Sequence, residues 1–210
     1  MEIGGRPILW HVMSIYIAQG FTRFLLLTGY KAGSVMDFAT GEPWPAEVSV
    51  RCLDTGLDTP TGSRVRQAAE AIGPEPFCAT YADGVANIDL HALLEEHQRG
   101  RRQATMTVVR PELPFGVAEL NGDNLVVGFA EKPRSERWIN GGFFCFQPEI
   151  AGRLGDEDVL EREPLARLAA EGQLGAFRHR GFWECLDTHK DALLLNDLWN
   201  AGRAPWKLWA

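Results

Sequence analysis

Apolar positions in the first half of the chain follow two patterns, one helical and one extended. Ile8, Val12 and Ile15 recur every three to four residues, which predicts an amphipathic helix over residues 7–18. Residues 24–28 form a short apolar run bounded by turn residues, as in a strand that is buried on both faces. The same patterns predict strands at 48–53 and 76–81 and helices at 33–38, 64–72 and 88–99.

The second half continues this alternation and adds a hairpin. Over residues 115–132, two apolar stretches flank the turn Asn121-Gly122-Asp123, which predicts an antiparallel pair. Strands that alternate with helices favour an α/β fold with a mostly parallel sheet and helices on both faces, and such sheets bind ligands at the carboxyl ends of their strands. The remaining predicted elements are strands at 104–110 and 141–146, a helix at 160–171, a short strand pair from 177 and a helix at 189–202.

The composition is that of an ordinary globular protein. The chain has 210 residues, 45% of them hydrophobic and 23% charged, so residues 1–210 suit one domain with a real core. The net charge of −7 comes without a dense Lys/Arg block, which argues against nucleic-acid binding as the main role. An acidic protein that handles anionic phosphates needs metal ions or a few well-placed cations.

The cysteines and histidines carry little chemistry by their spacing. The four cysteines form no CxxC pair, which argues against a zinc site or a disulfide framework. No apolar run is long enough to span a membrane and no signal peptide is visible, so the cytoplasm is the expected location. His11, on the apolar first helix, is predicted to be a core residue, and surface positions are predicted for His91, His97, His179 and His189.

Three carboxylates directly follow predicted buried strands. Asp83 comes after FCATYA, Glu131 after VVGFA, and Asp187 lies within FWECLDT. One interpretation is a turn residue or a helix N-cap, which is the common role of an Asp at a strand end. The other is a pair of carboxylates that converges on a divalent cation such as Mg²⁺, which proteins hold by one or two carboxylates plus substrate phosphates. Spacing alone leaves both interpretations open.

Three further segments offer groups for a phosphate or a sugar. Glu131-Lys132 supplies a carboxylate and an ammonium, or else closes the hairpin as a solvated charge pair. Asn140-Gly141-Gly142 joins a side-chain amide to backbone that a ligand can approach closely. Residues 61–64, TGSR, offer backbone amides and one cation, although glycine-rich turns are common.

Taken together, these segments resemble a known family. The motifs DTGLDTPTGSRV, FCATYADGVANID, WINGGFFCF and GFWECLDT follow one another in the order found in bacterial glucose-1-phosphate cytidylyltransferase, a sugar nucleotidyltransferase. The resemblance extends over essentially the whole chain, which makes it far more specific than any single motif. Its other stretches are EIGGRPILWHVM, GYK, FGVAEL, EKP, EREPLARLA and APWKLW.

The resemblance implies a Rossmann-like α/β fold, a homo-oligomer and a reaction. Members of this family join CTP to glucose 1-phosphate and form CDP-glucose and pyrophosphate, with Mg²⁺ as cofactor and without nucleic acid or membrane. The sugar phosphate oxygen attacks the nucleotide α-phosphate in line. Such a reaction depends more on positioning and electrostatic stabilisation than on proton transfer.

The resemblance also implies roles for individual residues. Asp83 and Asp187 match the metal-binding aspartates of the family, and Lys132 matches the lysine on the sugar phosphate; all three are expected to be catalytic. The implied nucleotide-binding residues are Gly62, Arg64, Tyr81 and Gly84. The implied sugar-binding residues, in a portion that spans about 115–188, are Glu131, Asn140 and Gly141.

The chain departs from the family at its beginning. Family members carry a strand, a GGxGTRL loop and a lysine before the equivalent of EIGG, and none of these precedes EIGG here. That loop cradles the triphosphate with backbone amides, so we expect weak or no turnover and two strands without a neighbour. Three explanations stay open: a misplaced start, a natural short form that binds sugar nucleotides or regulates without catalysis, and a short form whose gap an oligomer neighbour fills.

Overall fold

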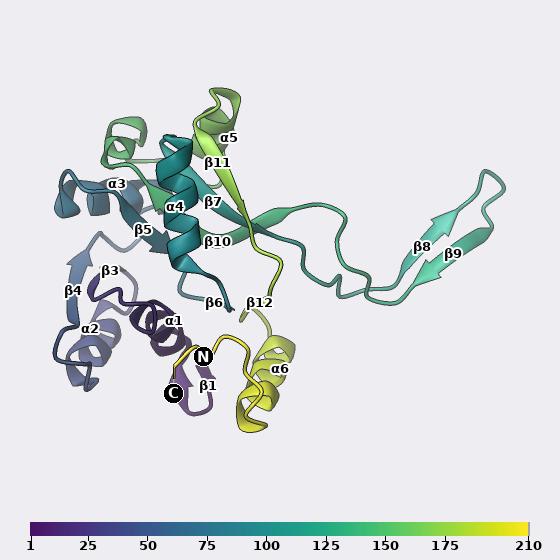
Figure 1. The fold of residues 1–210 in the computed structure, drawn as a ribbon, viewed down its shortest axis with the longest axis horizontal. Coiled ribbons are helices and arrows are strands. Elements are labelled where there is room, and N and C mark those ends of the chain that lie inside the picture. The colour runs from purple at the N-terminus through teal and green to yellow at the C-terminus, as the bar shows by residue number, and fades with distance from the viewer. Residues whose placement is uncertain (210) are drawn as a thin grey trace.

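Four strands form the main sheet of the computed structural model, which describes residues 1–209 (Figure 1). Their order is β11-β7-β10-β5. β10 runs antiparallel to both β5 and β7, whereas β11 is parallel to β7. The strands are β5 (Phe77–Thr80), β7 (Ala104–Val109), β10 (Ile139–Phe146) and β11 (Leu174–Arg178).

The mixed α/β fold class predicted from the sequence is confirmed, but parallel pairing is less frequent than expected. Only one of the three strand pairs in this sheet is parallel. The reason is the connection between β7 and β10, a long arm that turns the chain back on itself and so makes its neighbours antiparallel (Figure 1). The arm contains β8 (Val117–Leu120) and β9 (Val126–Ala130), the predicted hairpin.

A second, parallel pair lies apart from the main sheet. β3 (Arg23–Thr28) and β4 (Ser49–Asp54) pair in parallel along their whole length, joined by the crossover helix α2 (Ala32–Gly41). Among residues 1–209, β3 pairs with β4 alone and β5 with β10 alone. β4 likewise pairs with β3 alone and β11 with β7 alone, so four strands of these two sheets have one unpaired edge among these residues. This pairing does not single out the two strands expected from the sequence to lack a neighbour.

The core has two halves because β10 is buried on both faces. Phe143 and Cys145 point to a cluster formed with α1 and α4, whereas Phe144 and Phe146 point to a cluster on the opposite face. Burial of each such phenylalanine contributes roughly 1.5–3 kcal/mol. The helices are α1 (Ile8–Ile17) and α4 (Leu90–Gly100) on the first face, and α3 (Thr61–Ile72), the 3₁₀ helix η1 (Pro148–Arg153) and α5 (Glu163–Ala170) on the second.

Two helix boundaries differ from the prediction for a physical reason. α3 begins at Thr61 rather than at residue 64, because the amides of Gly62 and Ser63 both donate to the carbonyl of Asp158 (2.9 and 3.3 Å). α5 spans only 163–170 rather than 160–171, because Arg162 has a non-helical backbone (φ −99°, ψ −118°).

The predicted surface positions of His97 and His179 are wrong, while the core position of His11 is confirmed. All three are buried. His97 lies on the apolar side of α4 with Leu90 and Leu93, a spacing that identifies it as a core residue. Its ring bonds to Thr105 Oγ1, at 2.9 Å. The ring of His179 bonds to the carbonyl of Phe182, also at 2.9 Å.

The two ends of the chain lie close together (Figure 1), and aromatic side chains near both ends form a cluster. Trp10 and His11 of α1 lie within 6.3 Å, centroid to centroid, of the ring of Trp209. No helix within residues 1–209 combines the length and apolar character needed to cross a membrane. The remaining elements are β1 (Glu2–Ile3), β2 (Arg6–Pro7), β6 (Gly84–Ala86), β12 (Trp183–Cys185) and α6 (His189–Asn200).

Candidate active site

A cavity of about 190 Å³ opens at the carboxyl end of β5, where the antiparallel β6-β12 pair meets β10. Six of the ten site residues predicted from the sequence line it. These six are Tyr81, Asp83, Gly84, Asn140, Gly141 and Asp187. The structure thus brings together the predicted metal residues and part of both the predicted nucleotide and sugar sets.

Strand pairing places the two aspartates side by side. Gly84 pairs with Cys185, and the N–H of Leu186 donates to the Asp83 carbonyl at 2.8 Å. Burial raises the pKa of Asp83, and the negative charge of Asp187 raises it further. A divalent cation between the two carboxylates would relieve this repulsion.

The donor set fits a hard, partly hydrated cation. Both aspartates offer carboxylate oxygens, and Mg²⁺ takes one or two carboxylates together with waters and substrate phosphates. Within residues 1–209 no group of three or more His, Cys, Asp or Glu side chains is placed to hold a metal. The site therefore suits an ion that phosphate oxygens complete, rather than an ion caged by protein alone.

Tyr81 forms one wall of the cavity and is held from two sides. Its hydroxyl donates to Glu161 and accepts from Asn140 Nδ2 at 3.4 Å. Burial raises the pKa of Tyr81, and the hydrogen bond to Glu161 raises it further. The phenol therefore stays protonated at neutral pH and keeps its donor bond to the carboxylate.

Next to Tyr81, the backbone of Gly141 and Gly142 also lines the cavity. Gly142 has a φ of +78°, and a Cβ there would lie 2.9 Å from the Tyr81 ring, so the position requires glycine. Its N–H donates to Asn140 Oδ1 at 2.9 Å, which fixes the amide side chain. The indole of Trp183 donates to the carbonyl of Gly141 at 2.8 Å and closes this side of the cavity.

Three residues of this region were missed by sequence reasoning. Trp183 and Cys185 line the cavity, and Glu161 binds Tyr81 from outside it. Burial and Asp187 raise the pKa of Cys185 to about 12, so it remains a thiol that donates to Asp187 Oδ2. The signal for Trp183 and Cys185 was available, because strand alternation in FWECLD puts both on the face of Asp187.

The predicted nucleotide residues Gly62 and Arg64 do not line the cavity but are linked to it. The hydroxyl of Thr61, at the start of α3, donates to Glu161 Oε2 at 2.7 Å, and Glu161 in turn binds Tyr81. Gly62 is closely packed, because a Cβ there would lie 2.6 Å from the carbonyl of Asp158.

The guanidinium of Arg64 donates hydrogen bonds to the loop before α3 and to the end of β3. It donates to the carbonyls of Thr28 and Thr59 at 2.9 Å and of Gly56 at 3.0 Å. These bonds fix the loop 54–60 against the end of β3. A direct contact of Arg64 with a nucleotide stays a prediction.

The structure does not bring Glu131 and Lys132 to the cavity. Both follow β9 on the arm and are exposed, and neither lines the cavity. Lys132 has a φ of +46°, in the left-handed region that few non-glycine residues adopt. Their sugar and phosphate roles stay predictions.

Comparison with known proteins identifies relatives over nearly the whole chain. The sequence model of the nucleotidyl transferase family matches residues 1–192. A relative from Bacillus subtilis, named as a probable glucose-1-phosphate cytidylyltransferase, is 39% identical over 228 aligned residues that cover 99% of this chain and 89% of the relative. The glucose-1-phosphate cytidylyltransferase of Salmonella typhimurium is 36% identical, with 100% of this chain and 90% of the relative covered.

A solved structure shares the fold. The crystal structure of HddC from Yersinia pseudotuberculosis superposes with a TM-score of 0.75 at 20% identity, over 95% of this chain and 88% of that one. The resemblance deduced from the sequence motifs is confirmed by the family match and by the two relatives. The chain belongs to the nucleotidyl transferase family.

Proposed function

We propose that the protein is a sugar-1-phosphate nucleotidyltransferase that forms CDP-glucose and pyrophosphate from CTP and glucose 1-phosphate. The observation that carries this proposal is the convergence of Asp83, Asp187, Tyr81 and Asn140 on one cavity. The choice of cytidine and glucose is supported by relatives at 36–39% identity that are named for this reaction.

The two aspartates are the proposed ligands of Mg²⁺. The nucleotidyl transferase family generally uses a divalent metal ion. When bound, the ion would neutralise charge on the phosphate oxygens during in-line attack. Asp83 and Asp187 would hold the ion, and the thiol of Cys185 orients the Asp187 carboxylate by a hydrogen bond. Tyr81 keeps a fixed hydroxyl at the edge of the site.

The remaining roles follow the two sides of the cavity. Asn140 and Gly141 are proposed to bind the sugar, because their amide and backbone groups are held rigidly by Gly142 and Trp183. Glu131 is proposed as a further sugar ligand and Lys132 as the ligand of the sugar phosphate. The proposed nucleotide ligands are Tyr81 and Gly84 in the cavity, together with Gly62 and Arg64 of α3 outside it.

We also propose a homo-oligomer, which is supported by the exposed apolar side chains of the arm. No specific observation favours the alternative of a catalytically inactive sugar-nucleotide-binding or regulatory homologue. The cytoplasmic location and the weak turnover expected from the sequence stay predictions.

The test is release of pyrophosphate from CTP plus glucose 1-phosphate with Mg²⁺, measured beside CDP-glucose binding. We expect CDP-glucose to bind and CTP to be preferred over GTP, UTP and dTTP. Asp83→Asn should lower any turnover at least about 100-fold, since a single electrostatic contact of this kind is worth roughly 2.7–4 kcal/mol. Equal use of all four nucleotides, or no binding of any sugar nucleotide, would refute the assignment.

A further inference from the structure

Two of the cysteines, Cys78 and Cys145, lie opposite each other in the main sheet. The antiparallel register of β5 and β10 pairs Cys145 with Cys78, and their two Sγ atoms are 3.4 Å apart. Both side chains are free thiols. Residues opposite each other in an antiparallel pair have Cα atoms about 4.5–5.5 Å apart, within the roughly 4.4–6.8 Å that a disulfide spans. The backbone therefore already suits a covalent bond between these sulfurs.

The two thiols differ in access and in acidity. Cys145 is fully buried in the cluster formed with α1 and α4, whereas Cys78 is only half-buried and packs against the border of that cluster. The hydrogen bond between the two thiols lowers the pKa of Cys78 and raises that of Cys145. The thiolate is the reactive form of cysteine. Cys78 is therefore the thiol that a reagent reaches and oxidises first.

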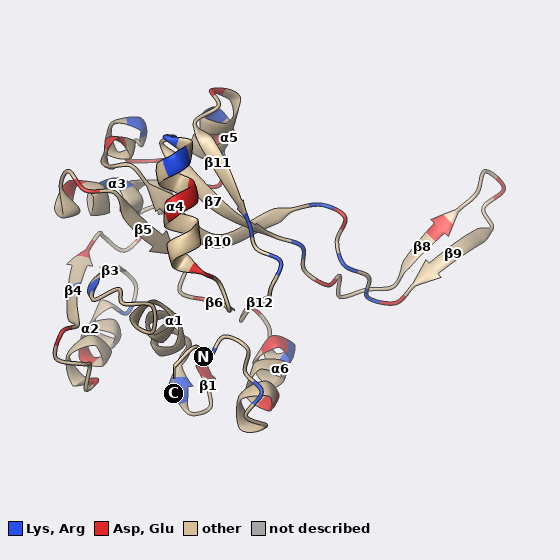
Figure 2. Cartoon of the chain, in the orientation of Figure 1, with Lys and Arg blue, Asp and Glu red and all other residues tan. Residues whose placement is uncertain are grey.

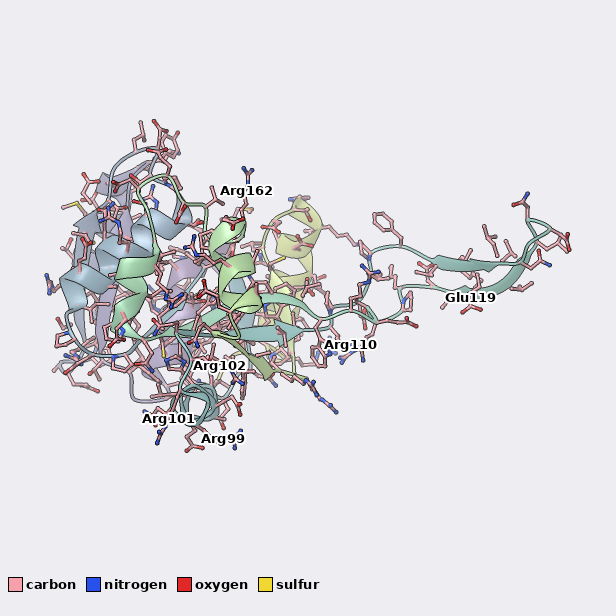
Figure 3. The ribbon with its side chains drawn as sticks, turned by 90° about the horizontal axis from the view of Figure 1, so that it is seen from above. Arg99, Arg101, Arg102, Arg110, Glu119 and Arg162 are labelled. Atoms are coloured by element: carbon pink, nitrogen blue, oxygen red, sulfur yellow. The ribbon has the colours of Figure 1, made fainter. Side chains whose placement is uncertain are left out.

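The surroundings of this strand pair suit a small, uncharged reagent. Among residues 1–209, β5 pairs with β10 alone. The arm with β8 and β9 extends away from the body and does not fold back over β5 (Figures 1 and 3). Neither β5 nor β10 contains a charged residue, as Figure 2 shows. A hydroperoxide is an oxidant of the right size and charge for such a position.

We propose that Cys78 and Cys145 are a redox-sensitive pair, which a hydroperoxide converts into a reversible disulfide that locks β5 to β10 beside the cavity. A single bond of this kind differs from a disulfide framework, which the cysteine spacing argues against. In a reducing compartment, disulfides are usually transient and often sense oxidants.

The oxidation by hydrogen peroxide takes two steps. The Cys78 sulfur attacks one peroxide oxygen, the O–O bond breaks, and the thiol proton leaves with the other oxygen as water, so that Cys78 becomes a sulfenic acid. The Cys145 sulfur then attacks Cys78 Sγ, the S–O bond breaks as the S–S bond forms, and the second thiol proton leaves in a second molecule of water. Each sulfur loses one electron and the peroxide gains two. A dithiol reductant reverses the bond by thiol–disulfide exchange.

The disulfide would act on one wall of the cavity. Cys78 precedes Tyr81 on one segment, and Cys145 follows Gly142 on the other. The N–H of Tyr81 donates to the carbonyl of Gly142 at 3.1 Å, which continues the pairing of the two segments into the cavity wall. A pair at the edge of a sheet separates locally more easily than its centre does. A covalent bond between the strands should suppress this separation and hold Tyr81 against Gly142.

Peptide mapping of the full chain without reductant tests the bond. After hydrogen peroxide and alkylation, the folded protein should yield a linked pair of peptides that contains Cys78 and Cys145, and dithiothreitol should restore both thiols. Cys78→Ala should form no such link. Cys52→Ser is the matched control, because Cys52 is a half-buried thiol on β4, and this variant should react as the wild type does. Far-UV circular dichroism confirms that both variants are folded.

Three outcomes of the mapping would overturn the proposal. These are the absence of the linked peptides, a link that forms only in urea-unfolded protein, and a link from Cys78 to Cys52 or Cys185 in place of Cys145. The wild-type chain alone distinguishes them, so the test does not depend on the folding of a variant.

Hydrogen exchange tests the effect on the cavity wall. Exchange of the Tyr81 amide should be at least about tenfold slower in the oxidised protein than in the reduced one, while exchange in β7 stays the same. Peroxide should have no effect on this amide in Cys78→Ala. Equal exchange in the two redox states of the wild type would show that the bond does not lock the strands. Neither measurement uses a nucleotide or a sugar, so both are independent of the proposed function.

Discussion

Asp83 and Asp187 come from opposite halves of the chain and meet because β6 pairs with β12. Their residue type and their position after strands could be predicted from the sequence, whereas their role as metal ligands stays a prediction. Their adjacency could not be deduced from spacing, since it depends on a short antiparallel pair formed by segments about a hundred residues apart.

Asp83→Asn should abolish high-affinity binding of Mg²⁺ or Mn²⁺ while leaving the metal-free chain at least as stable as the wild type. The reason is that burial and Asp187 raise the pKa of Asp83, so its negative charge is unfavourable without a cation. Calorimetric titration with Mn²⁺ and urea unfolding without metal measure the two effects. A variant that binds the ion as well as wild type, or unfolds far more easily, would contradict this assignment.

Glu161 opens the stretch EREPLARLA, but no role for this side chain was predicted from the sequence. It accepts from Tyr81 at one oxygen and from Thr61 at the other, and so ties the cavity to the start of α3. Hydrogen bonds to a charged group contribute roughly 1.5–3 kcal/mol, less where water has access.

Glu161→Ala should therefore weaken CDP-glucose binding by about tenfold, and Glu161→Gln should recover part of this loss. Glu163→Gln is the matched control, since Glu163 is an exposed carboxylate two residues away on α5. Tyr81→Phe should add little to Glu161→Ala, because both changes break the same bond. Full additivity of the two losses would indicate that the residues act separately.

The periodicity of apolar residues located the six α-helices and the longer strands, but not β1, β2, β6 or the 3₁₀ helix η1. The predicted strand pair from residue 177 is wrong, because β11 pairs with β7 and β12 with β6. The errors lie where tertiary contacts decide. α3 begins early because Asp158 caps it from a distant loop. The abundance of antiparallel pairs follows from the arm, whose length the hairpin pattern predicted but whose effect on strand direction it did not. His97 was missed although its spacing with Leu90 and Leu93 placed it on the buried side of α4.

Arg64 makes more hydrogen bonds to the loop 54–60 than any other side chain, and the order of this loop should depend on it. Arg64→Lys keeps the charge but cannot form the several bonds to loop carbonyls that the guanidinium makes. Hydrogen exchange of residues 55–60 should become at least about tenfold faster, while exchange in β10 stays as in the wild type. Unchanged exchange in the loop with lost nucleotide binding would instead point to a direct ligand contact.

At the scale of the molecule, two buried neutral histidines make stability dependent on pH. Burial lowers the pKa of His11 and of His97. His11 accepts from the Trp206 indole and its other nitrogen bonds to the carbonyl of Ile3, an arrangement that requires the neutral ring. In the unfolded chain these two histidines become protonated near pH 6.5, whereas in the folded chain they stay neutral at that pH.

The contribution of these histidines to the free energy of unfolding should therefore be complete above about pH 6.5. It should decrease as the pH falls below this value, by at most about 1.4 kcal/mol per pH unit for each histidine. Urea unfolding at a series of pH values measures this slope. His97→Gln removes one of the two groups and should make the dependence shallower. A dependence that is the same in this variant would exclude His97 as a source.

We propose that the cavity between β5, β10 and β12 is the sugar-nucleotide site and that its aspartates bind the metal ion. The most direct measurement is an anomalous difference map from crystals of the chain grown with Mn²⁺ and CDP-glucose. We expect a peak within coordination distance of both Asp83 and Asp187, with the sugar beside Asn140 and Gly141. A metal peak or a sugar nucleotide bound elsewhere on the molecule would contradict it.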